Sequence, residues 1–338
     1  MMKFLKKHSS LLCLLVVVFA ILIYTGTVTK NYTIKVINTA LLNSLVAYGL
    51  SLMLGVGGQL VFSGITFMGI GAYTTANLLT GRLGITCSST AAMMYSLLVA
   101  GIIAIVFGML FMRLRGVFCT FATIGLVTIC YSLFAFYQPL FGRPDGISGI
   151  PSWTLFGHTL KGYREWFYVL LIIVLLVGLV MERIRGSRFG RALSAVRDNE
   201  IAAQTLGVNL YWTRVFAFVI ASLFAALGGS LFAMHNKFVF ANSFSYNQSI
   251  NVLVMAMLGG INSTPGILIG AVLVTFLPEL LRNVSSGLIM LTYGVLVIFL
   301  MIFMPMGIGG LLENGFKKLY RWQKKKDAIK LANKTEGE

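Results

Sequence analysis

The residue types that usually carry enzyme chemistry are few and scattered in this sequence. The three histidines, His8, His158 and His235, lie far apart, and no Ser-His-Asp arrangement accompanies them. The four cysteines form no CxxC pair and lack the spacing of a metal site. No GxxxxGK[ST] phosphate-binding loop occurs. We therefore expect a chain that is not an enzyme and that holds no metal and no cofactor of its own.

Ionisable residues within apolar segments often mark ion pathways in membrane proteins. Only Glu279 qualifies, and it precedes Arg282 by three residues, so we expect an ion pair at a helix end. Carriers driven by protons or sodium commonly bury carboxylates along their path. A neutral or zwitterionic solute therefore fits this chain better than a strongly ionic one.

The composition places these residues in a bilayer. Of the 338 residues, 57% are hydrophobic and only 11% are charged, whereas soluble domains are about 25% charged. Several apolar runs approach the roughly 20 residues that cross a membrane, where helices are the expected element. The fold class is therefore all-α, a polytopic bundle of membrane helices. Spans are predicted at about 10–29, 38–56, 91–112, 117–137, 166–184, 214–234 and 288–305, with another leading from residue 55 to Arg82.

Residues 249–281 are apolar but interrupted by a polar, glycine-rich break near residue 262. The break either separates two short spans or forms one re-entrant hairpin. About ten spans in total are favoured, with eight as the alternative.

The net charge of +17 is clustered at alternate span ends. Nucleic-acid binding explains basic charge in a soluble protein, but the positive-inside rule explains this pattern better. It places the N-terminus (1–9), the central basic loop (186–213) and the basic tail (313–338) in the cytoplasm. The membrane domain then covers 10–312, and residues 138–165, rich in turn formers, make an outer loop. The first apolar run has no small-residue cleavage site, so we interpret it as an uncleaved helix.

Two glycine-broken segments occur, one in each half of the chain. The first extends from Gly57 to Ala72 and the second from Gly259 to Ala271. Such paired segments either line the translocation path of a transporter or allow close helix packing through small residues. The sequence leaves both interpretations open. The candidate path residues are Gly57, Gly58, Gln59, Ser63, Gly69, Gly71 and Tyr73 in the first segment, and Gly259, Gly260, Asn262, Gly266 and Gly270 in the second.

The polar stretch 186–213 has helical periodicity, with Phe189, Leu193 and Val196 on one face. Asp198 is expected to cap a second short helix, and Gly207 to end it. That helix would offer Ile201, Ala202 and Leu206 as an apolar edge, with small residues that let a partner approach closely. The pair indicates either a docking surface or an amphipathic loop resting on the inner leaflet.

The stretch Glu200-Ile-Ala-Ala-Gln-Thr-Leu-Gly207 resembles the EAA loop of ABC importer permeases. Its surroundings resemble the version in branched-chain amino-acid permeases of the LivM type, as do residues 58–73, 257–271 and 293–307. The resemblance covers roughly residues 38–312. Val61, Ser63 and Gly64 depart from the family, which commonly has Ser, Gly and His there, so the solute stays open.

The resemblance implies the permease subunit of an ABC importer for branched-chain or related amino acids in a bacterial plasma membrane. Its expected partners are a second permease, two ATPase subunits that hold ATP and Mg, and an extracellular or periplasmic solute-binding protein. Residues implied in ATPase coupling are Arg191, Arg197, Asp198, Glu200, Ala202, Ala203 and Gly207. The alternatives are a urea or small-amide permease of the same family, and a stand-alone secondary carrier or channel.

Overall fold

A computed structural model describes residues 31–280, apart from 83, 85–86, 115, 143–145 and 156, together with a few short stretches outside this range. The spans predicted at 10–29 and 288–305 lie almost entirely outside the described residues, as do the N-terminal segment, the basic tail and Arg282. The expected count of ten spans therefore stays a prediction.

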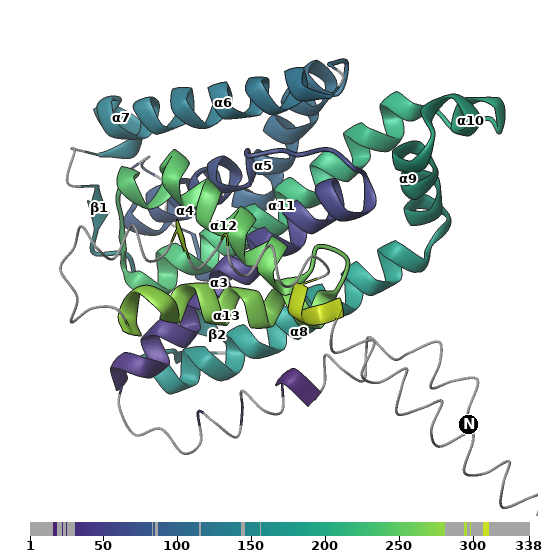
Figure 1. Cartoon of the computed structure of the whole chain (residues 1–338). Helices are drawn as coiled ribbons and strands as arrows, with labels where there is room; N and C mark the ends of the chain where they lie inside the picture. Colours follow the sequence, from purple (N-terminus) through teal and green to yellow (C-terminus); the bar gives the residue numbers. More distant parts are fainter. Residues whose placement is uncertain are drawn as a thin grey trace, which may run out of the picture.

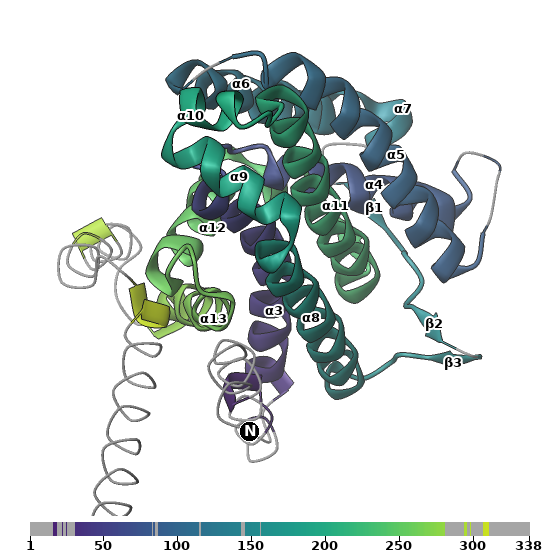
Figure 2. The same cartoon turned by 90° about the vertical axis from the view of Figure 1, so that its right-hand side faces the viewer.

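The described chain is a bundle of helices with four very short strands (Figures 1 and 2). The helices are α3 (Asn31–Ser51) with its π-helical extension η1 (Leu52–Val56), α4 (Gly64–Thr80), α5 (Ser89–Phe111), α6 (Val117–Phe136), α7 (Gln138–Phe141), α8 (Tyr163–Gly186), α9 (Arg188–Asp198), α10 (Glu200–Thr205), α11 (Leu210–Asn236), the 3-10 helix η2 (Ala241–Phe244), α12 (Tyr246–Gly259) and α13 (Thr264–Leu280). The strands are β1 (Ile147–Ser148), β2 (Thr154–Leu155), β3 (His158–Thr159) and β4 (Phe238–Val239).

Five of the described helical segments are long and apolar enough to cross a membrane: Asn31–Val56, Ser89–Phe111, Val117–Phe136, Tyr163–Gly186 and Leu210–Asn236. They agree with predicted spans, although the first begins at Asn31 rather than near residue 38. The segment Asn31–Val56 is 89% buried over its most apolar stretch, whereas α5 and α6 are each 28% buried. The bundle is therefore built around α3 and α11, with α5 and α6 at its edge.

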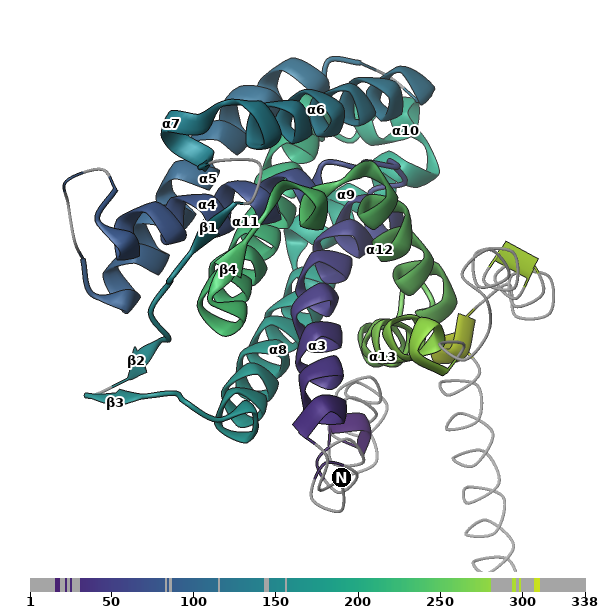
Figure 3. The same ribbon diagram turned by 90° about the vertical axis from the view of Figure 1, so that its left-hand side faces the viewer.

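The bundle has two distinct ends (Figure 1). Helices α9 and α10 lie at one, which we call the loop end, and the short strands lie at the other, which we call the strand end (Figure 3). Strand β1 pairs antiparallel with β4, and β2 with β3. These strands belong to the predicted outer loop 138–165 and to the turn after α11. Helix α8 runs from the strand end to the loop end and leads directly into α9.

Helices α12 and α13 lie on either side of the break near residue 262. They pack side by side as an antiparallel hairpin joined at residues 260–263. Ser51, at the end of α3, donates a hydrogen bond to the Ile261 carbonyl in that turn, and Tyr32, at the start of α3, bonds Glu279 near the end of α13. Helix α13 therefore lies along the length of α3, whereas α12 has only 14 residues. The choice between two short spans and a re-entrant hairpin stays a prediction.

Candidate functional site

Helix α9 forms as its periodicity predicts. The Ser187 hydroxyl accepts a hydrogen bond from the Gly190 amide at 3.2 Å and caps the first turn. Leu193 and Val196 are buried and Phe189 is half-buried, so the predicted apolar face is confirmed. This face holds α9 against the loop end of the bundle.

Asn199, not Asp198, caps helix α10. Its side-chain oxygen accepts hydrogen bonds from the amides of Ile201 and Ala202 at 3.0 and 3.1 Å. Asp198 is the last residue of α9, whereas Asn199 has the extended backbone that a capping residue needs. The prediction for Asp198 is therefore wrong by one position, and its carboxylate pairs with Arg197 instead. Gly207, at φ 81°, follows the end of α10 as predicted.

The apolar edge of α10 faces away from the protein. The side chains of Ile201 and Leu206 are among the most exposed large apolar groups described, at 75% and 81%. Ala202 is also exposed, but Ala203 is buried against Val196 and Leu210. Ala202 can thus let a partner approach closely, whereas Ala203 can only hold α10 on its neighbours.

Glu200 and Arg191 make bonds within the chain. The Glu200 carboxylate pairs with Arg214 of α11, whose guanidinium is almost completely buried. A buried guanidinium needs such a partner, because an unpaired buried charge is costly. The pair therefore fixes α10 to the start of α11. Arg191 donates to the Gly186 carbonyl at 2.8 Å and closes the turn between α8 and α9.

Arg197 connects this loop to the first glycine segment. Its guanidinium donates to the Gly55 carbonyl in η1 at 2.5 Å. Gly58 has a φ of 68°, and a β-carbon there would overlap the Arg197 side chain. A β-carbon on Gly57 would lie 3.3 Å from Leu193. The structure thus brings Gly57 and Gly58 onto helix α9.

The turn of the second glycine segment also meets η1, immediately before the first segment. A β-carbon on Gly55 would lie 2.6 Å from the Ile261 carbonyl oxygen and 2.8 Å from the Asn262 side-chain oxygen. Arg185, which the sequence analysis did not select, donates to the carbonyls of both Ile261 and Asn262. Two candidate segments and the basic loop therefore converge at the loop end.

The remaining glycines of these segments pack helices. A β-carbon on Gly71 would overlap the Ala226 carbonyl of α11, and one on Gly69 would reach the Phe134 ring. Gly259, Gly266 and Gly270 meet backbone across the α12–α13 hairpin in the same way. Gly260, at φ 97°, forms the turn itself. The close approach of backbone to these glycines favours the interpretation that they allow tight helix packing.

Gln59, Ser63 and Tyr73 are buried. Neither amide atom of Gln59 has a hydrogen-bond partner among the described residues. The Tyr73 ring belongs to an aromatic cluster with Phe134, Phe141 and Phe244, toward the strand end. Tyr73 is therefore not brought to the loop end, whereas Gln59 adjoins it in the chain. A buried amide without partners is a group that a polar solute could bond.

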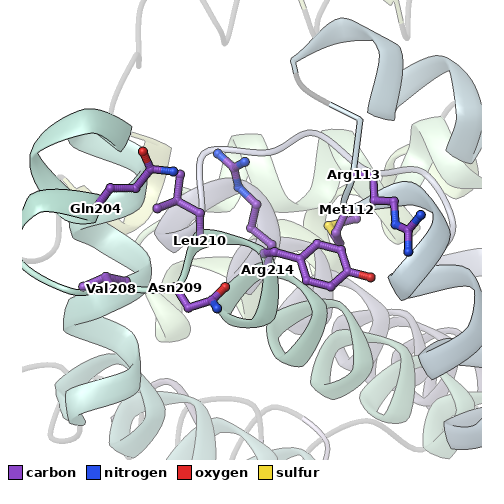
Figure 4. A pocket seen from close by; sticks show the side chains of 8 residues that line it. Met112, Arg113, Gln204, Val208, Asn209, Leu210 and Arg214 are labelled. Carbon is purple, nitrogen blue, oxygen red and sulfur yellow. The ribbon is translucent and has the colours of Figure 1, made fainter.

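A cleft of about 460 Å³ opens beside the loop (Figure 4). It lies between the end of α5, helix α10 and the first turns of α11. Its lining residues are Met112, Arg113, Gln204, Val208, Asn209, Leu210, Tyr211 and Arg214. The described part of the chain contains no group of three or more His, Cys, Asp or Glu residues that could hold a metal ion.

Comparison with known proteins identifies the family to which the chain belongs. The model of the family described as "Branched-chain amino acid transport system / permease component" matches residues 32–305. The chain belongs to this permease family. The match extends from α3 to beyond α13, so both glycine segments and the α9–α10 loop are parts of the family's own domain.

Two curated relatives of this permease are high-affinity branched-chain amino acid transport system permease proteins LivM. The Escherichia coli K12 protein is 31% identical over 302 residues, which cover 82% of this chain and 69% of the relative. The Salmonella typhimurium protein is 33% identical over 286 residues, 77% of this chain and 66% of the relative. The permease thus spans about two thirds of the length of these relatives.

A more distant relative is an autoinducer 2 import system permease protein LsrC from Yersinia pseudotuberculosis, 27% identical over 304 residues, 86% of this chain and 80% of the relative. No solved structure matches the permease. Its relatives are transport permeases, and its apolar helices make it an integral membrane protein. The relatives of the permease therefore include import systems for more than one kind of solute.

Proposed function

We propose that this permease is the membrane subunit of an ATP-driven importer and that the α9–α10 loop receives the movement of two separate ATPase subunits. The observation that carries this proposal is the exposed edge of α10. Ile201 and Leu206 extend from a short helix that Asn199 caps and that the Glu200–Arg214 pair fixes to the bundle. Exposed apolar groups on a rigid support are typical of a contact surface.

The contacts of Arg197 support a path from this surface to the membrane helices. Closure of the ATPase pair displaces α10, and α9 moves with it through the buried contacts of Val196 and Ala203. Arg197 carries the displacement to Gly55 in η1. A π-helical turn is an irregular point in a helix, and such turns are frequent at functional sites. Opening and closing of the path then take place where the two glycine segments meet.

We infer that the solute is a branched-chain or related amino acid, delivered by an extracellular binding protein and transported through a pore completed by a second permease. The relatives named LivM support this solute, and the scarcity of carboxylates in the described spans fits a zwitterion. The relative named LsrC makes a second solute class worth testing. A urea or small-amide solute remains the alternative suggested by Val61, Ser63 and Gly64.

The experiment is uptake by the permease reconstituted with its co-purifying subunits in proteoliposomes that contain ATP. We expect uptake of radiolabelled leucine that requires ATP hydrolysis and is not competed by urea. Replacing exposed Leu206 with glutamate should abolish stimulation of the ATPase, because a charge would face the apolar contact. Replacing Gln204, which is also exposed, with glutamate should have little effect. Uptake by the permease alone, without ATP, would instead identify a stand-alone carrier or channel.

A further inference from the structure

Arg185 lies in the last turn of α8, immediately before the α9–α10 loop, and its guanidinium makes an unusually large set of contacts. It donates to the Asn262 carbonyl at 2.7 Å and to the Ile261 carbonyl at 3.2 Å. It also donates to the Thr264 hydroxyl at 3.0 Å and to the Ser51 hydroxyl at 2.5 Å. A single side chain thus bonds the end of α3 and the turn of the α12–α13 hairpin.

The acceptors around Arg185 are themselves bonded to one another. Ser51 donates to the Ile261 carbonyl at 2.6 Å, and Thr264 donates to the Glu182 carboxylate. Glu182 also pairs with Arg185, one turn away on α8, at 3.5 Å. Both charged side chains are less than one-fifth exposed. Each hydroxyl therefore accepts from Arg185 and donates onward, so the network has a consistent direction of hydrogen bonding.

The carbonyl groups of the α12–α13 turn explain why residue 185 is an arginine. The turn at residues 260–263 leaves carbonyl groups without the partners that a continuous helix would supply, and such groups are costly near a membrane. A guanidinium presents five donors in a rigid planar fork, which lets it bond several carbonyls at once. A lysine has one ammonium group and could not span the same acceptors.

Arg197, in the last turn of α9, makes the corresponding contact with the other break. It bonds the Gly55 carbonyl in η1, the irregular turn that follows α3. One arginine just before α9 and one in its last turn therefore each bond backbone at a break between membrane helices. The breaks touch each other where Gly55 meets Ile261.

We propose that Arg185 is the positioning residue that makes the α12–α13 turn move together with the end of α8 and the α9–α10 loop. It acts on the second glycine segment while Arg197 acts on the first, so one displacement of α9 reaches both. This inference rests on the proposed function, because it names the residue through which the ATPase movement reaches the second segment.

The test compares Arg185→Gln with Arg183→Gln, a matched change of an exposed arginine in the same turn of α8. Both are assembled with their ATPase and permease partners in proteoliposomes, and solute transported per ATP hydrolysed is measured. We expect this ratio to fall about tenfold in Arg185→Gln, the size of effect that changes within a coupled network produce. It should be unchanged in Arg183→Gln. A purely structural role would lower transport and ATP hydrolysis in proportion and leave the ratio unchanged, which would overturn the proposal.

Hydrogen exchange of the same complexes is the second measurement. Arg185→Gln should raise amide exchange at residues 260–264 and 52–58 without changing α5. Ser51→Ala, which removes one acceptor and keeps the charge, should give a smaller effect of the same kind and carries the test if Arg185→Gln does not insert. Unchanged exchange at residues 260–264 in either variant overturns the proposal. If wild-type complexes show no ATP-driven uptake, the proposed function fails, while exchange still decides whether Arg185 holds the turn.

Discussion

Asn199 and Asp198 are neighbours that differ little in chemistry, yet only one of them caps α10. Both side chains can accept a hydrogen bond from a free amide at a helix start. The backbone decides between them, because Asp198 still has helical geometry in α9 and Asn199 does not. The Asp198 carboxylate is left to bind Arg197 beside the Gly55 contact. The two residues therefore have separate tasks, one in α10 and one beside η1.

Replacing Asn199 with alanine should loosen α10. The change removes two hydrogen bonds to the amides of Ile201 and Ala202, and loss of such a cap costs about 1 kcal/mol. We expect faster hydrogen exchange at residues 200–206 and weaker stimulation of the ATPase. Asp198→Ala is the matched control and should leave exchange in α10 unchanged. Equal exchange in the two variants would mean that the cap does not hold α10.

At the residue scale, the sequence could predict what depends on neighbours a few positions away. The face of Leu193 and Val196 follows from helical spacing, and Gly207 follows from its usual place after a helix. Arg185 could not be found in this way. Its partners Ser51 and Ile261 are 134 and 76 residues away. Only the packing of α3, α8 and the hairpin brings them together.

Among the elements, α4 and α11 make the most extensive contact between two helices in the described bundle. Gly71 of α4 faces the backbone of Ala226, and Gly229 of α11 faces the backbone of Met68. Small residues at both positions let the two helices approach to backbone contact, which is how membrane helices gain packing energy. The contact gives Gly71 a packing role, whereas its place on a translocation path stays a prediction.

Replacing Gly71 with alanine should therefore separate α4 from α11. The new β-carbon would overlap the Ala226 carbonyl, and backbone cannot give way as a flexible side chain can. Overpacking of this kind costs about 1–3 kcal/mol, which should appear as a lower melting temperature in detergent. Gly125→Ala in α6 is the control, because its β-carbon would meet nothing within 4 Å. A normal melting temperature for Gly71→Ala would show that the helices are less closely packed than described.

The elements themselves were predictable where hydropathy is continuous. Helices α5, α6, α8 and α11 agree with predicted spans, because apolar length alone identifies a membrane helix. The break near residue 262 was ambiguous, since hydropathy gives the position of a polar turn and not its depth. The contacts of Ser51 and Tyr32 at opposite ends of α3 show that α13 lies along α3, and both α12 and α13 are shorter than the five candidate spans of the described chain.

For the whole molecule, the outer helices show which surface meets lipid or another apolar partner. The most exposed large side chains of α5 and α6 include Ile102, Leu98, Phe118 and Phe136. A soluble protein rarely exposes such a continuous apolar surface. The loop end beyond this surface carries Arg113, Arg183, Arg188, Arg191 and Arg197. An apolar belt with arginines at one end is the pattern from which orientation in a membrane is predicted.

We predict that the loop end faces the cytoplasm, because basic residues near span ends stay on that side. The measurement is labelling of single-cysteine variants, made after the four native cysteines are replaced, with a maleimide that does not cross membranes. Arg188→Cys in α9 should react only in inside-out vesicles, whereas Lys161→Cys, between β3 and α8, should react in intact cells. Both positions are exposed, so a failure to react reports the side of the membrane and not burial. The reverse pattern would put α10 outside the cell, where no ATPase subunit could reach Ile201 and Leu206, and would exclude the proposed coupling.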